Sequence, residues 1–250
     1  MRVETDVMLV LERSGTHGNE LHLPPEKLDR PMYERVAKVI EACGGKWNRK
    51  AKAHLFDGPA VDAIDAVLLN GEVAKPQDFG FFETPPELVV RVMYEAQISE
   101  GMEVLEPSAG TGRLADAARD VGANVLCVEL QQKNCEALRA KKHHFIPTTD
   151  FLTFERPILP ARFDRVVMNP PFARSADVKH ILHAYSMLKP GGRLVSIAGA
   201  GVLFRQDRLY QELRQLAAAH GSMEPLPEGS FKSAGTMVNT ALVILDADPA

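Results

Sequence analysis

The stretch "MEVLEPSAGTGRLADAA", residues 102–118, runs from an apolar, strand-like segment through a glycine-rich turn into a helical pattern. Gly110 and Gly112 allow a positive φ angle and a close approach of the backbone to a ligand. The helix that follows begins near Arg113, and its first N–H groups are free to bind polar atoms. This order of strand, glycine turn and helix predicts an α/β unit with a ligand-binding turn.

The rest of the chain from about residue 80 alternates between short apolar strands and helical patterns. Strands are expected at residues 102–106, 124–130, 163–168, 192–198 and 237–245. Helices are expected at residues 85–98, 112–122, 132–142, 175–188 and 206–221. Near-continuous apolar strands separated by helices predict a parallel sheet with both faces covered.

The N-terminal part of the sequence has a different pattern, so we divide the chain into a small α+β domain, residues 1–76, and an α/β domain, residues 77–250. In the small domain, "VMLVL" (residues 7–11) is a candidate strand, and "KWNRKAKAHLF" (residues 46–56) is typical of a basic hairpin or strand. Two helices are expected, one from Pro31 to the stop at Gly44 and one at residues 59–71.

Composition limits the classes of protein that the chain can belong to. Its 250 residues carry 29 Lys and Arg against 33 Asp and Glu, a net charge of −4 at pH 7. This balance excludes nucleic-acid binding through bulk charge but is compatible with a local basic patch. The 3 cysteines have no CxxC spacing, which argues against a structural zinc. The N-terminus lacks the apolar core of a signal peptide, and no apolar run approaches the roughly 20 residues that span a bilayer. We therefore expect a soluble cytoplasmic protein without a metal or a membrane partner.

Acidic residues end the two strands nearest the glycine turn, Glu106 before it and Glu129 after the next helix. A carboxylate at Glu129 can accept hydrogen bonds from both hydroxyls of a ribose. The spacing of Gly110, Gly112 and Ala115 also satisfies the dinucleotide-binding fingerprint. Glu106 stands where a pyrophosphate-binding turn usually has glycine, and its carboxylate would repel phosphate. It could instead lie near an ammonium group.

The segment "EPSAGTG" (residues 106–112) closely resembles the first motif of S-adenosylmethionine-dependent methyltransferases, whose cofactor has a cationic amine and no phosphate. The resemblance makes Glu129 the ribose acid. It also places "TTDFL" (residues 148–152) at the adenine of the cofactor, where Asp150 accepts from the amino group and Phe151 packs on the ring. From the residue pattern alone, Asp150 also fits a helix cap or a turn.

The segment "FGFFETPPELVVRVM" (residues 79–93) resembles the part that precedes the glycine turn in amino-methylating DNA enzymes. It would place Thr84 at the methionine end of the cofactor, and Thr84 also fits the N-cap of the next helix. The cofactor-binding residues that the resemblance implies are Phe82, Thr84, Pro85, Glu106, Pro107, Ser108, Ala109, Gly110, Gly112, Glu129, Leu130, Asp150, Phe151 and Asn169.

A second turn ends the strand "RVVM" with Asn169, Pro170, Pro171 and Phe172, which we take as the catalytic residues. The side-chain oxygen of Asn169 and the carbonyl of Pro170 can accept hydrogen bonds from the two N–H groups of an amino group. These bonds would orient the nitrogen lone pair toward a methyl donor. The prolines hold these acceptors rigid, and Phe172 offers a face for a base. By itself, an Asn-Pro turn after a strand is a common structural feature.

The glycine motif comes first and NPPF second, followed by "GSFKSAGTMVNTALVIL" (residues 229–245). This order resembles the gamma arrangement of N6-adenine DNA methyltransferases over about residues 79–247. The resemblance implies a Rossmann-like, seven-stranded class I methyltransferase sheet, S-adenosylmethionine as the cofactor and DNA as the partner. It also implies a flipped target base that stacks on Phe231.

The large target-recognition region that is usual in these enzymes has no counterpart, because the link after Phe172 is short and the chain ends soon after its last strand. The N-terminal domain is the expected replacement. Its basic segment offers Trp47 for stacking and Arg49, Lys50 and Lys52 for phosphate contacts. The alternative is a solvated hairpin with Trp47 in a small core.

Several alternatives to a DNA adenine methyltransferase stay open on these residues. One is an enzyme that methylates a base amino group in rRNA or tRNA. Another is a protein glutamine methyltransferase, although that family usually has tyrosine at the position of Phe172. A non-catalytic nucleic-acid-binding protein would not need an intact NPPF turn, and an NAD oxidoreductase would have no use for it.

Overall fold

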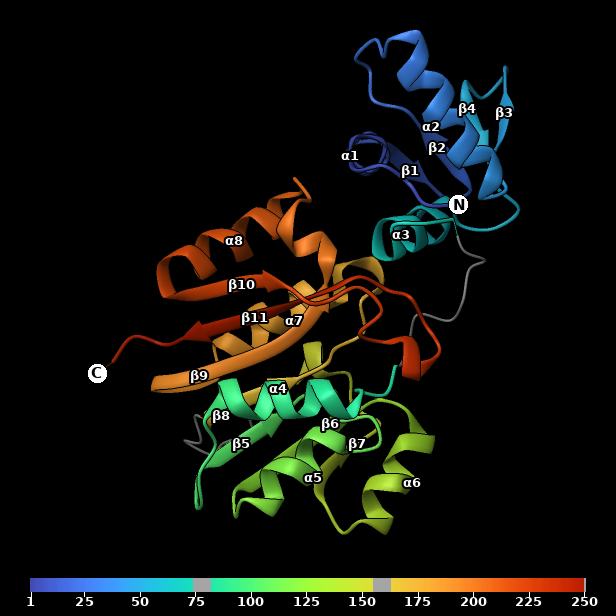
Figure 1. Cartoon of the computed structure of the whole chain (residues 1–250). Helices are drawn as coiled ribbons and strands as arrows, with labels where there is room; N and C mark the ends of the chain where they lie inside the picture. Colours follow the sequence, from blue (N-terminus) through green and yellow to red (C-terminus); the bar gives the residue numbers. More distant parts are fainter. Residues whose placement is uncertain (74–81, 155–162, 250) are drawn as a thin grey trace.

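The structure is a computed structural model that describes residues 1–73, 82–154 and 163–249. Figure 1 shows a small N-terminal domain beside a larger α/β domain. The domain boundary expected between residues 76 and 77, and the first residues of the segment that begins at residue 79, lie outside the described residues.

The small domain is an α+β unit built around an antiparallel sheet with the order β1-β2-β4-β3. Its strands are β1 (Gly15–His17), β2 (Glu20–His22), β3 (Lys46–Asn48) and β4 (Ala53–Leu55). Its helices are α1 (Thr5–Glu12), α2 (Arg30–Ala42) and α3 (Ala60–Asn70). The expected basic hairpin is therefore confirmed as β3–β4, and both expected helices are present.

The segment "VMLVL", for which we expected a strand, is helical and forms most of α1. Val7, Val10 and Leu11 are its buried residues, and their spacing puts them on one face of a helix toward the core of the small domain. A strand would have divided these side chains between two faces. The helical period therefore outweighed the strand preference of the valines.

The large domain contains a seven-stranded sheet with the order β10-β11-β9-β8-β5-β6-β7. Its strands are β5 (Glu103–Glu106), β6 (Asn124–Glu129), β7 (His144–Pro147), β8 (Phe163–Met168), β9 (Leu188–Gly199), β10 (Gly221–Pro225) and β11 (Thr240–Asp246). Its α-helices are α4 (Pro86–Ala96), α5 (Arg113–Asp120), α6 (Gln132–Ala140), α7 (Ala176–Tyr185) and α8 (Arg208–His220). Its short 3₁₀ turns are η1 (Phe151–Thr153), η2 (Ala173–Ser175), η3 (Ala200–Leu203) and η4 (Lys232–Ala234).

The sheet confirms the expected Rossmann-like, seven-stranded architecture, with two differences in detail. β11 pairs antiparallel with both β9 and β10, so the sheet is mainly rather than entirely parallel. Neither β7 nor β10 was expected. β7 is short and ends in a proline, and β10 is a mostly exposed edge strand, so neither has the apolar pattern of a buried strand.

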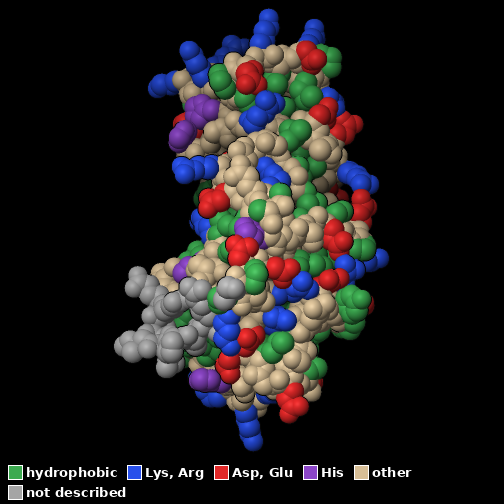
Figure 2. Space-filling model, turned by 90° about the vertical axis from the view of Figure 1, so that its left-hand side faces the viewer, with side chains coloured by type: hydrophobic (Ala, Val, Ile, Leu, Met, Phe, Trp, Pro, Cys, Tyr) green, Lys and Arg blue, Asp and Glu red, His purple; other side chains and the backbone are tan. Residues whose placement is uncertain are grey.

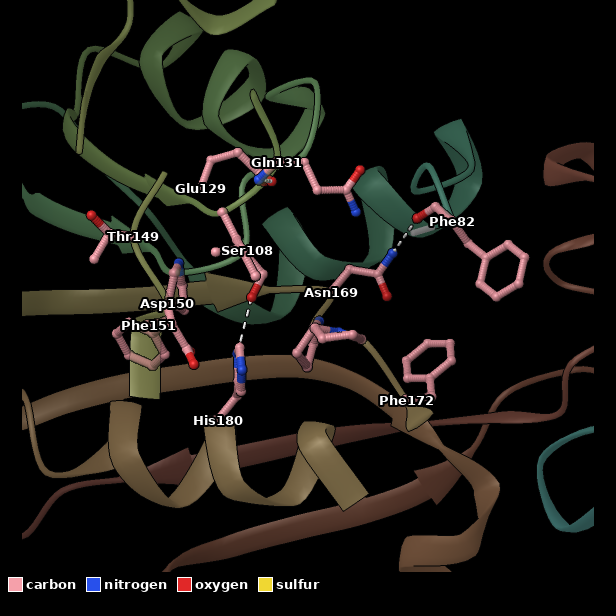
Figure 3. A pocket seen from close by; sticks show the side chains of 14 residues that line it. Phe82, Ser108, Glu129, Gln131, Thr149, Asp150, Phe151, Asn169, Phe172 and His180 are labelled. Atoms are coloured by element: carbon pink, nitrogen blue, oxygen red, sulfur yellow. Dashed lines mark hydrogen bonds between the residues drawn. The ribbon is translucent and has the colours of Figure 1, made fainter. Parts of the chain in front are cut away.

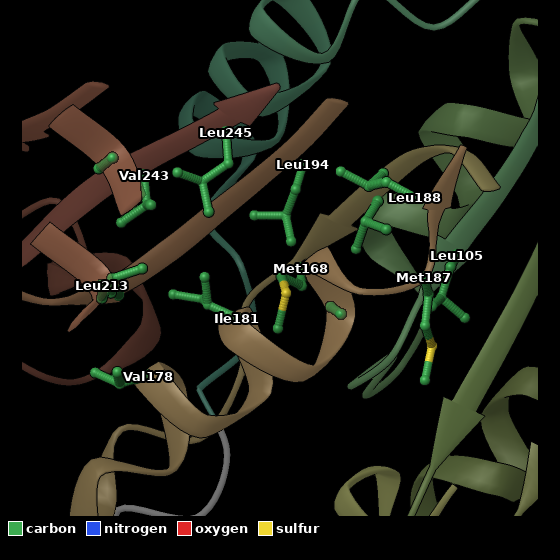
Figure 4. Packing of buried hydrophobic residues seen from close by; sticks show 14 of the residues in the cluster. Leu105, Met168, Val178, Ile181, Met187, Leu188, Leu194, Leu213, Val243 and Leu245 are labelled. Atoms are coloured by element: carbon green, nitrogen blue, oxygen red, sulfur yellow. The ribbon is translucent and has the colours of Figure 1, made fainter. Parts of the chain in front are cut away.

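The two faces of the sheet are buried under different helices (Figure 1). α4 and α5 cover one face, where Val104 of β5 and Val167 of β8 join their apolar residues. α7 and α8 cover the other, where Met168 lies beside Ile181 and Leu105 beside Met187 (Figure 4). Successive residues of β5 and β8 thus point to opposite faces, as the strand period requires. In the described part of the chain, no helix combines the length and apolar character needed to cross a membrane.

Candidate active site

The candidate active site lies where the chain changes direction within the large sheet. After β5 the chain adds β6 and β7 on one side and then returns to place β8 on the other side of β5. Ligands of open α/β sheets bind at such a switch point, beyond the carboxyl ends of the strands. Glu106 ends β5 and Asn169 follows β8, so the glycine turn and the NPPF turn lie next to each other.

A cavity of about 650 Å³, counting the open space at its mouth, lies between these turns (Figure 3). An adjoining cavity of about 230 Å³ shares Phe82, Ser108 and Asn169 with it. The residues expected from the sequence that line the larger cavity are Phe82, Pro107, Ser108, Glu129, Leu130, Asp150, Phe151, Asn169, Pro170, Pro171 and Phe172. Those that line only the smaller cavity are Thr84, Glu106 and Ala109.

Some expected site residues line neither cavity, and some residues of the cavity were not expected. The residues away from both cavities are Pro85, Gly110, Gly112, Phe231, Trp47, Arg49, Lys50 and Lys52. Gln131, Thr149 and His180 also line the larger cavity and were not among the expected site residues. Gln131 could have been found from its place just after the strand expected at residues 124–130, and Thr149 from its place in "TTDFL", whereas His180 is brought in by the packing of α7.

Asn169 has its side-chain nitrogen fully bonded and its side-chain oxygen free. The nitrogen donates to the carbonyl oxygen of Phe82 at 2.9 Å and to Oγ1 of Thr84 at 3.1 Å. Oδ1 is buried and has no hydrogen-bond partner. Figure 3 shows the oxygen pointing away from Phe82, on the side where Phe172 lies. Buried acceptors are rarely left unpaired in proteins, so this atom is ready to accept from a donor that enters the cavity.

The bond from Asn169 also corrects one expectation for Thr84. The N-cap position of α4 is Pro85, and no side chain caps the helix. The hydroxyl of Thr84 faces Asn169 instead of the helix, and its backbone carbonyl accepts from Arg113 at 2.8 Å. Thr84 therefore connects the start of α4 to both turns of the site.

The glycine turn is fixed by the carboxylate of Glu129, which is buried at the end of β6. Its Oε2 accepts from the backbone N–H of Gly110 at 2.6 Å, and its Oε1 accepts from that of Gln131 at 2.7 Å. Gly112 has φ +85°, and a Cβ atom there would lie 2.8 Å from Leu138. The turn therefore needs glycine at this position. Oε1 of Glu129 also accepts from Nδ2 of Asn134 at 3.3 Å, so the carboxylate has about one acceptor site left for a ligand.

Glu106 is buried at the end of β5 and accepts from the backbone N–H of Ala115 at 2.8 Å. Burial raises the pKa of this carboxyl well above its usual value, an effect that the Ala115 bond only partly offsets. Of the described residues that line the larger cavity, none is a lysine or an arginine, whereas Glu129 and Asp150 are acidic. The lining thus disfavours a phosphate group and favours a ligand without one.

Asp150 and Phe151 form the far side of the cavity. Asp150 is exposed and caps η1 by accepting from the backbone N–H of Leu152 at 3.0 Å, so the expected cap is present and the residue also lines the cavity. Phe151 is buried against His180, with ring centroids 5.4 Å apart. Leu130, by contrast, is 59% exposed at the cavity, which leaves its apolar side chain open to a flat ligand.

His180 on α7 is hydrogen-bonded to the glycine turn, with 3.0 Å between its Nδ1 and Oγ of Ser108 (Figure 3). The residue is 8% exposed, and burial lowers the pKa of its imidazole to about 4. The ring is therefore uncharged at neutral pH. It joins α7, on one face of the sheet, to the turn that follows β5.

We expect His180→Gln to alter how stability depends on pH. The unfolded chain binds a proton at His180 near pH 6.5, but the folded chain does so only near pH 4, so acidification between these values favours unfolding. The variant has no histidine at this position and does not lose this stability on acidification. The difference in the free energy of unfolding between the wild type and the variant should therefore shrink by roughly 2–3 kcal/mol between pH 7.5 and pH 4.5. Urea unfolding at both pH values measures it. A difference that is independent of pH would contradict the assignment.

Phe172 and Phe231 pack together in the apolar cluster under α4. Their rings are nearly perpendicular, at 88°, with centroids 6.1 Å apart. Phe172 lines the cavity, whereas Phe231 is fully buried behind it, so the structure places Phe231 against Phe172 and not at the cavity. Phe231 thus supports the face that Phe172 presents.

The basic hairpin lies in the small domain, away from the cavities. Trp47 is 50% exposed on the edge strand β3 and meets His54 edge-on, with ring centroids 5.1 Å apart. The alternative in which Trp47 belongs to a small core is therefore wrong. Asn48 holds the turn by accepting from the backbone N–H groups of Lys50 and Ala51 at 2.9 and 3.0 Å.

Comparison with known proteins gives one family model and a set of similar folds. Residues 105–196 match the family model described as a methyltransferase domain. The Type II methyltransferase M.CvrRI of Paramecium bursaria Chlorella virus XZ-6E is 32% identical over 106 residues, which are 41% of this chain and 27% of that protein. This chain thus spans about a quarter of the length of the curated relative that it matches.

Solved structures with similar folds include two methyl-transferring enzymes. The methyltransferase subunit of a type I restriction-modification system from Streptococcus thermophilus has a TM-score of 0.59 and 21% identity, covering 76% of this chain and 49% of that one. A dimethyladenosine transferase from Plasmodium falciparum has a TM-score of 0.51 and 16% identity, covering 66% and 63%.

The large domain therefore has a Rossmann-like fold similar to that of the Streptococcus thermophilus methyltransferase subunit. The segment that matches the methyltransferase domain begins within β5 and ends within β9, so it contains the glycine turn, Glu129 and the NPPF turn.

Proposed function

We propose that this chain transfers a methyl group from S-adenosylmethionine to the exocyclic amino group of a nucleic-acid base, and that the base is adenine in DNA. The observation that carries the proposal is the free, buried Oδ1 of Asn169 at the cavity. An unpaired buried acceptor costs stability, so its retention fits a role in binding a donor.

The residues of the two cavities fit this cofactor. Glu129 would accept from the ribose hydroxyls, Leu130 would offer an apolar face to the adenine ring, and Asp150 would accept from the adenine amino group. Glu106, in the smaller cavity, offers a carboxylate to the methionine amine. When bound, S-adenosylmethionine supplies a methyl group made electrophilic by its sulfonium.

The chain's own contribution to the reaction is to position the amino group. Oδ1 of Asn169 and the carbonyl of Pro170 accept from its two N–H bonds, which draws the nitrogen toward a pyramidal geometry and frees its lone pair. The bonds to Phe82 and Thr84 hold the carboxamide in the orientation that presents Oδ1. Positioning of this kind lowers a barrier without a strong base, because the amino group becomes acidic only as the methyl group is transferred.

The choice of DNA adenine rests on motif order and on the similar proteins. The glycine motif precedes NPPF in this chain, as in the gamma arrangement of N6-adenine DNA methyltransferases. The viral protein is named a Type II methyltransferase, and the Streptococcus protein is the methyltransferase subunit of a restriction-modification system. The Plasmodium enzyme is named for dimethyladenosine.

The test is methyl transfer from tritiated S-adenosylmethionine to duplex DNA, rRNA, tRNA and protein in parallel, followed by analysis of the labelled nucleosides. We expect N6-methyladenine in the DNA sample. Label found only in RNA or only in glutamine would refute DNA as the substrate and would leave methyl transfer to an amino or amide nitrogen in place. A chain that binds nucleic acid and transfers no label to any polymer would support the non-catalytic alternative.

We further propose that the β3–β4 hairpin binds the phosphate backbone. The four cations Lys46, Arg49, Lys50 and Lys52 are exposed, and within the described ranges none forms an ion pair with an acid. Figure 2 shows Lys and Arg side chains gathered over the end of the molecule formed by the small domain. Trp47 offers a stacking surface beside them.

We expect Lys50→Glu/Lys52→Glu to weaken duplex binding by about 10-fold at physiological salt and to lower the slope of log K against log salt by about 2. Lys133→Glu/Lys179→Glu makes the same change of net charge on α6 and α7 and serves as the control. Fluorescence anisotropy of a labelled duplex measures affinity. Trp47 is the 1 tryptophan of the chain, so quenching of its emission reports contact directly. Equal effects of the two double variants would refute the assignment to the hairpin.

A further inference from the structure

The residues that directly follow the NPPF turn adopt an unusual backbone conformation. Arg174 has φ 56° and ψ 35°, and Ser175 has φ 58° and ψ 27°, so two successive residues with side chains lie in the left-handed region. That region is unfavourable for residues other than glycine. Such a conformation persists only where the surrounding structure holds it.

One contact that holds this turn comes from the small domain. Oδ2 of Asp65, on α3, accepts from the backbone N–H of Arg174 at 3.1 Å. Oδ1 of the same carboxylate forms an ion pair with the guanidinium of Arg205 at 3.3 Å. Arg205 follows η3, which comes after β9, so one carboxylate connects α3 to the segments that follow β8 and β9.

Asp65 differs from its neighbour Asp62 in its surroundings. Asp65 is 6% exposed, and Arg205 lies over the ring of Tyr210, 4.7 Å from the centroid. Asp62 also contacts the turn, through the side chain of Arg174 at 2.8 Å, but both side chains of that pair are substantially exposed. Exposed ion pairs contribute little, whereas a buried carboxylate must be paired and hydrogen-bonded. Of the two acids of α3 that contact the turn, Asp65 is therefore the one suited to hold it.

We propose that Asp65 is a positioning residue for methyl transfer, through which the small domain fixes the turn at Arg174 and Ser175 and so the placement of Pro170 and Phe172. The inference rests on the proposed function. Pro170 would supply one of the two acceptors for the amino group, and Phe172 the face for the base. A displacement of about 1 Å in a reacting group can lower a rate by about 100-fold, so a loosened turn should lower catalysis while cofactor binding persists.

The test compares Asp65→Ala, Asp65→Asn and Asp62→Ala in the full chain. For Asp65→Ala we expect kcat to fall by about 10–100-fold, with the Kd for S-adenosylmethionine within about threefold of the wild type. Asp65→Asn keeps an oxygen that can accept from the N–H of Arg174, so it should recover part of the lost kcat. Asp62→Ala should stay within about twofold of the wild type, as expected for an exposed pair.

Hydrogen exchange at the amide of Arg174 provides a reading that does not depend on activity. Exchange should be faster in Asp65→Ala than in the wild type, intermediate in Asp65→Asn and unchanged in Asp62→Ala. If Asp65→Ala does not fold, the Asn variant carries both measurements. Unchanged exchange in the Asp65 variants, or faster exchange with normal kcat, would overturn the proposal. If the wild type itself transfers no methyl group, the proposed function fails, while exchange still shows whether Asp65 holds the turn.

Discussion

Asn169→Ala is expected to lower kcat for methyl transfer by at least about 100-fold, the size of effect seen when a preorganised polar group is removed from a reacting centre. The substitution removes the free Oδ1, which would grip the amino group in the reaction. Glu129 and Leu130, which would hold the ribose and the adenine, are not bonded to Asn169. The Kd for S-adenosylmethionine, measured by calorimetry, should therefore change little.

Thr84→Val provides the matched control. It removes one acceptor of the side-chain nitrogen of Asn169 and leaves the bond to Phe82 and the free Oδ1 in place. We expect a loss of kcat of about 10-fold or less, because the net contribution of one hydrogen bond is about 1 kcal/mol. Near-normal turnover in Asn169→Ala would refute the proposed chemistry. Equal losses in the two variants would mean that Asn169 acts only by holding Phe82 and Thr84.

Glu129→Ala is expected to weaken S-adenosylmethionine binding by about 10–100-fold, since hydrogen bonds to a charged group contribute about 1.5–3 kcal/mol. The carboxylate would bind the ribose and already holds Gly110 and Gln131, so its removal loses a ligand contact and loosens the glycine turn together. Calorimetric titration measures the change. At saturating cofactor, kcat should fall far less than binding does.

Asp150→Asn is the comparison for Glu129→Ala. Asp150 is exposed and its Oδ1 caps η1, a bond that the oxygen of asparagine can also accept. Its effect on the Kd should be within about fivefold, because hydrogen bonds that stay exposed to water contribute less. A Glu129→Ala protein that binds S-adenosylmethionine as tightly as the wild type would show that the ligand does not lie against β6.

Five of the seven strands of the large domain, and the two turns of the site, could be predicted because each has a local signal. The glycine turn, the acids at Glu106 and Glu129 and the proline pair after β8 all stand at strand ends, and strand ends of a parallel sheet meet at one edge. The sequence could not show that Asn169 would bond Phe82 and Thr84. Those contacts join segments far apart in the chain and depend on how α4 packs on the sheet.

The errors in the prediction also have physical causes. The helix α1 was taken for a strand because β-branched residues outweighed a helical spacing in a short run. Phe231 was placed at the target base, but edge-to-face packing on Phe172 buries it completely. The contact between Asp65 and Arg174 could not be predicted, because nothing in the sequence of α3 shows that the partner of this carboxylate follows β8.

Under the proposed function, the Phe172–Phe231 pair separates the reactivity of the site from the shape of its base-binding surface. Under the proposed function, reactivity depends on Asn169 and Pro170, while the shape of the base-binding surface depends on how Phe231 supports Phe172 from the segment between β10 and β11. Mutations in that segment can therefore tune which base is accepted and leave the reacting groups untouched. Related proteins could therefore differ in substrate preference through substitutions around Phe231 while they keep the same residues at Asn169 and Pro170.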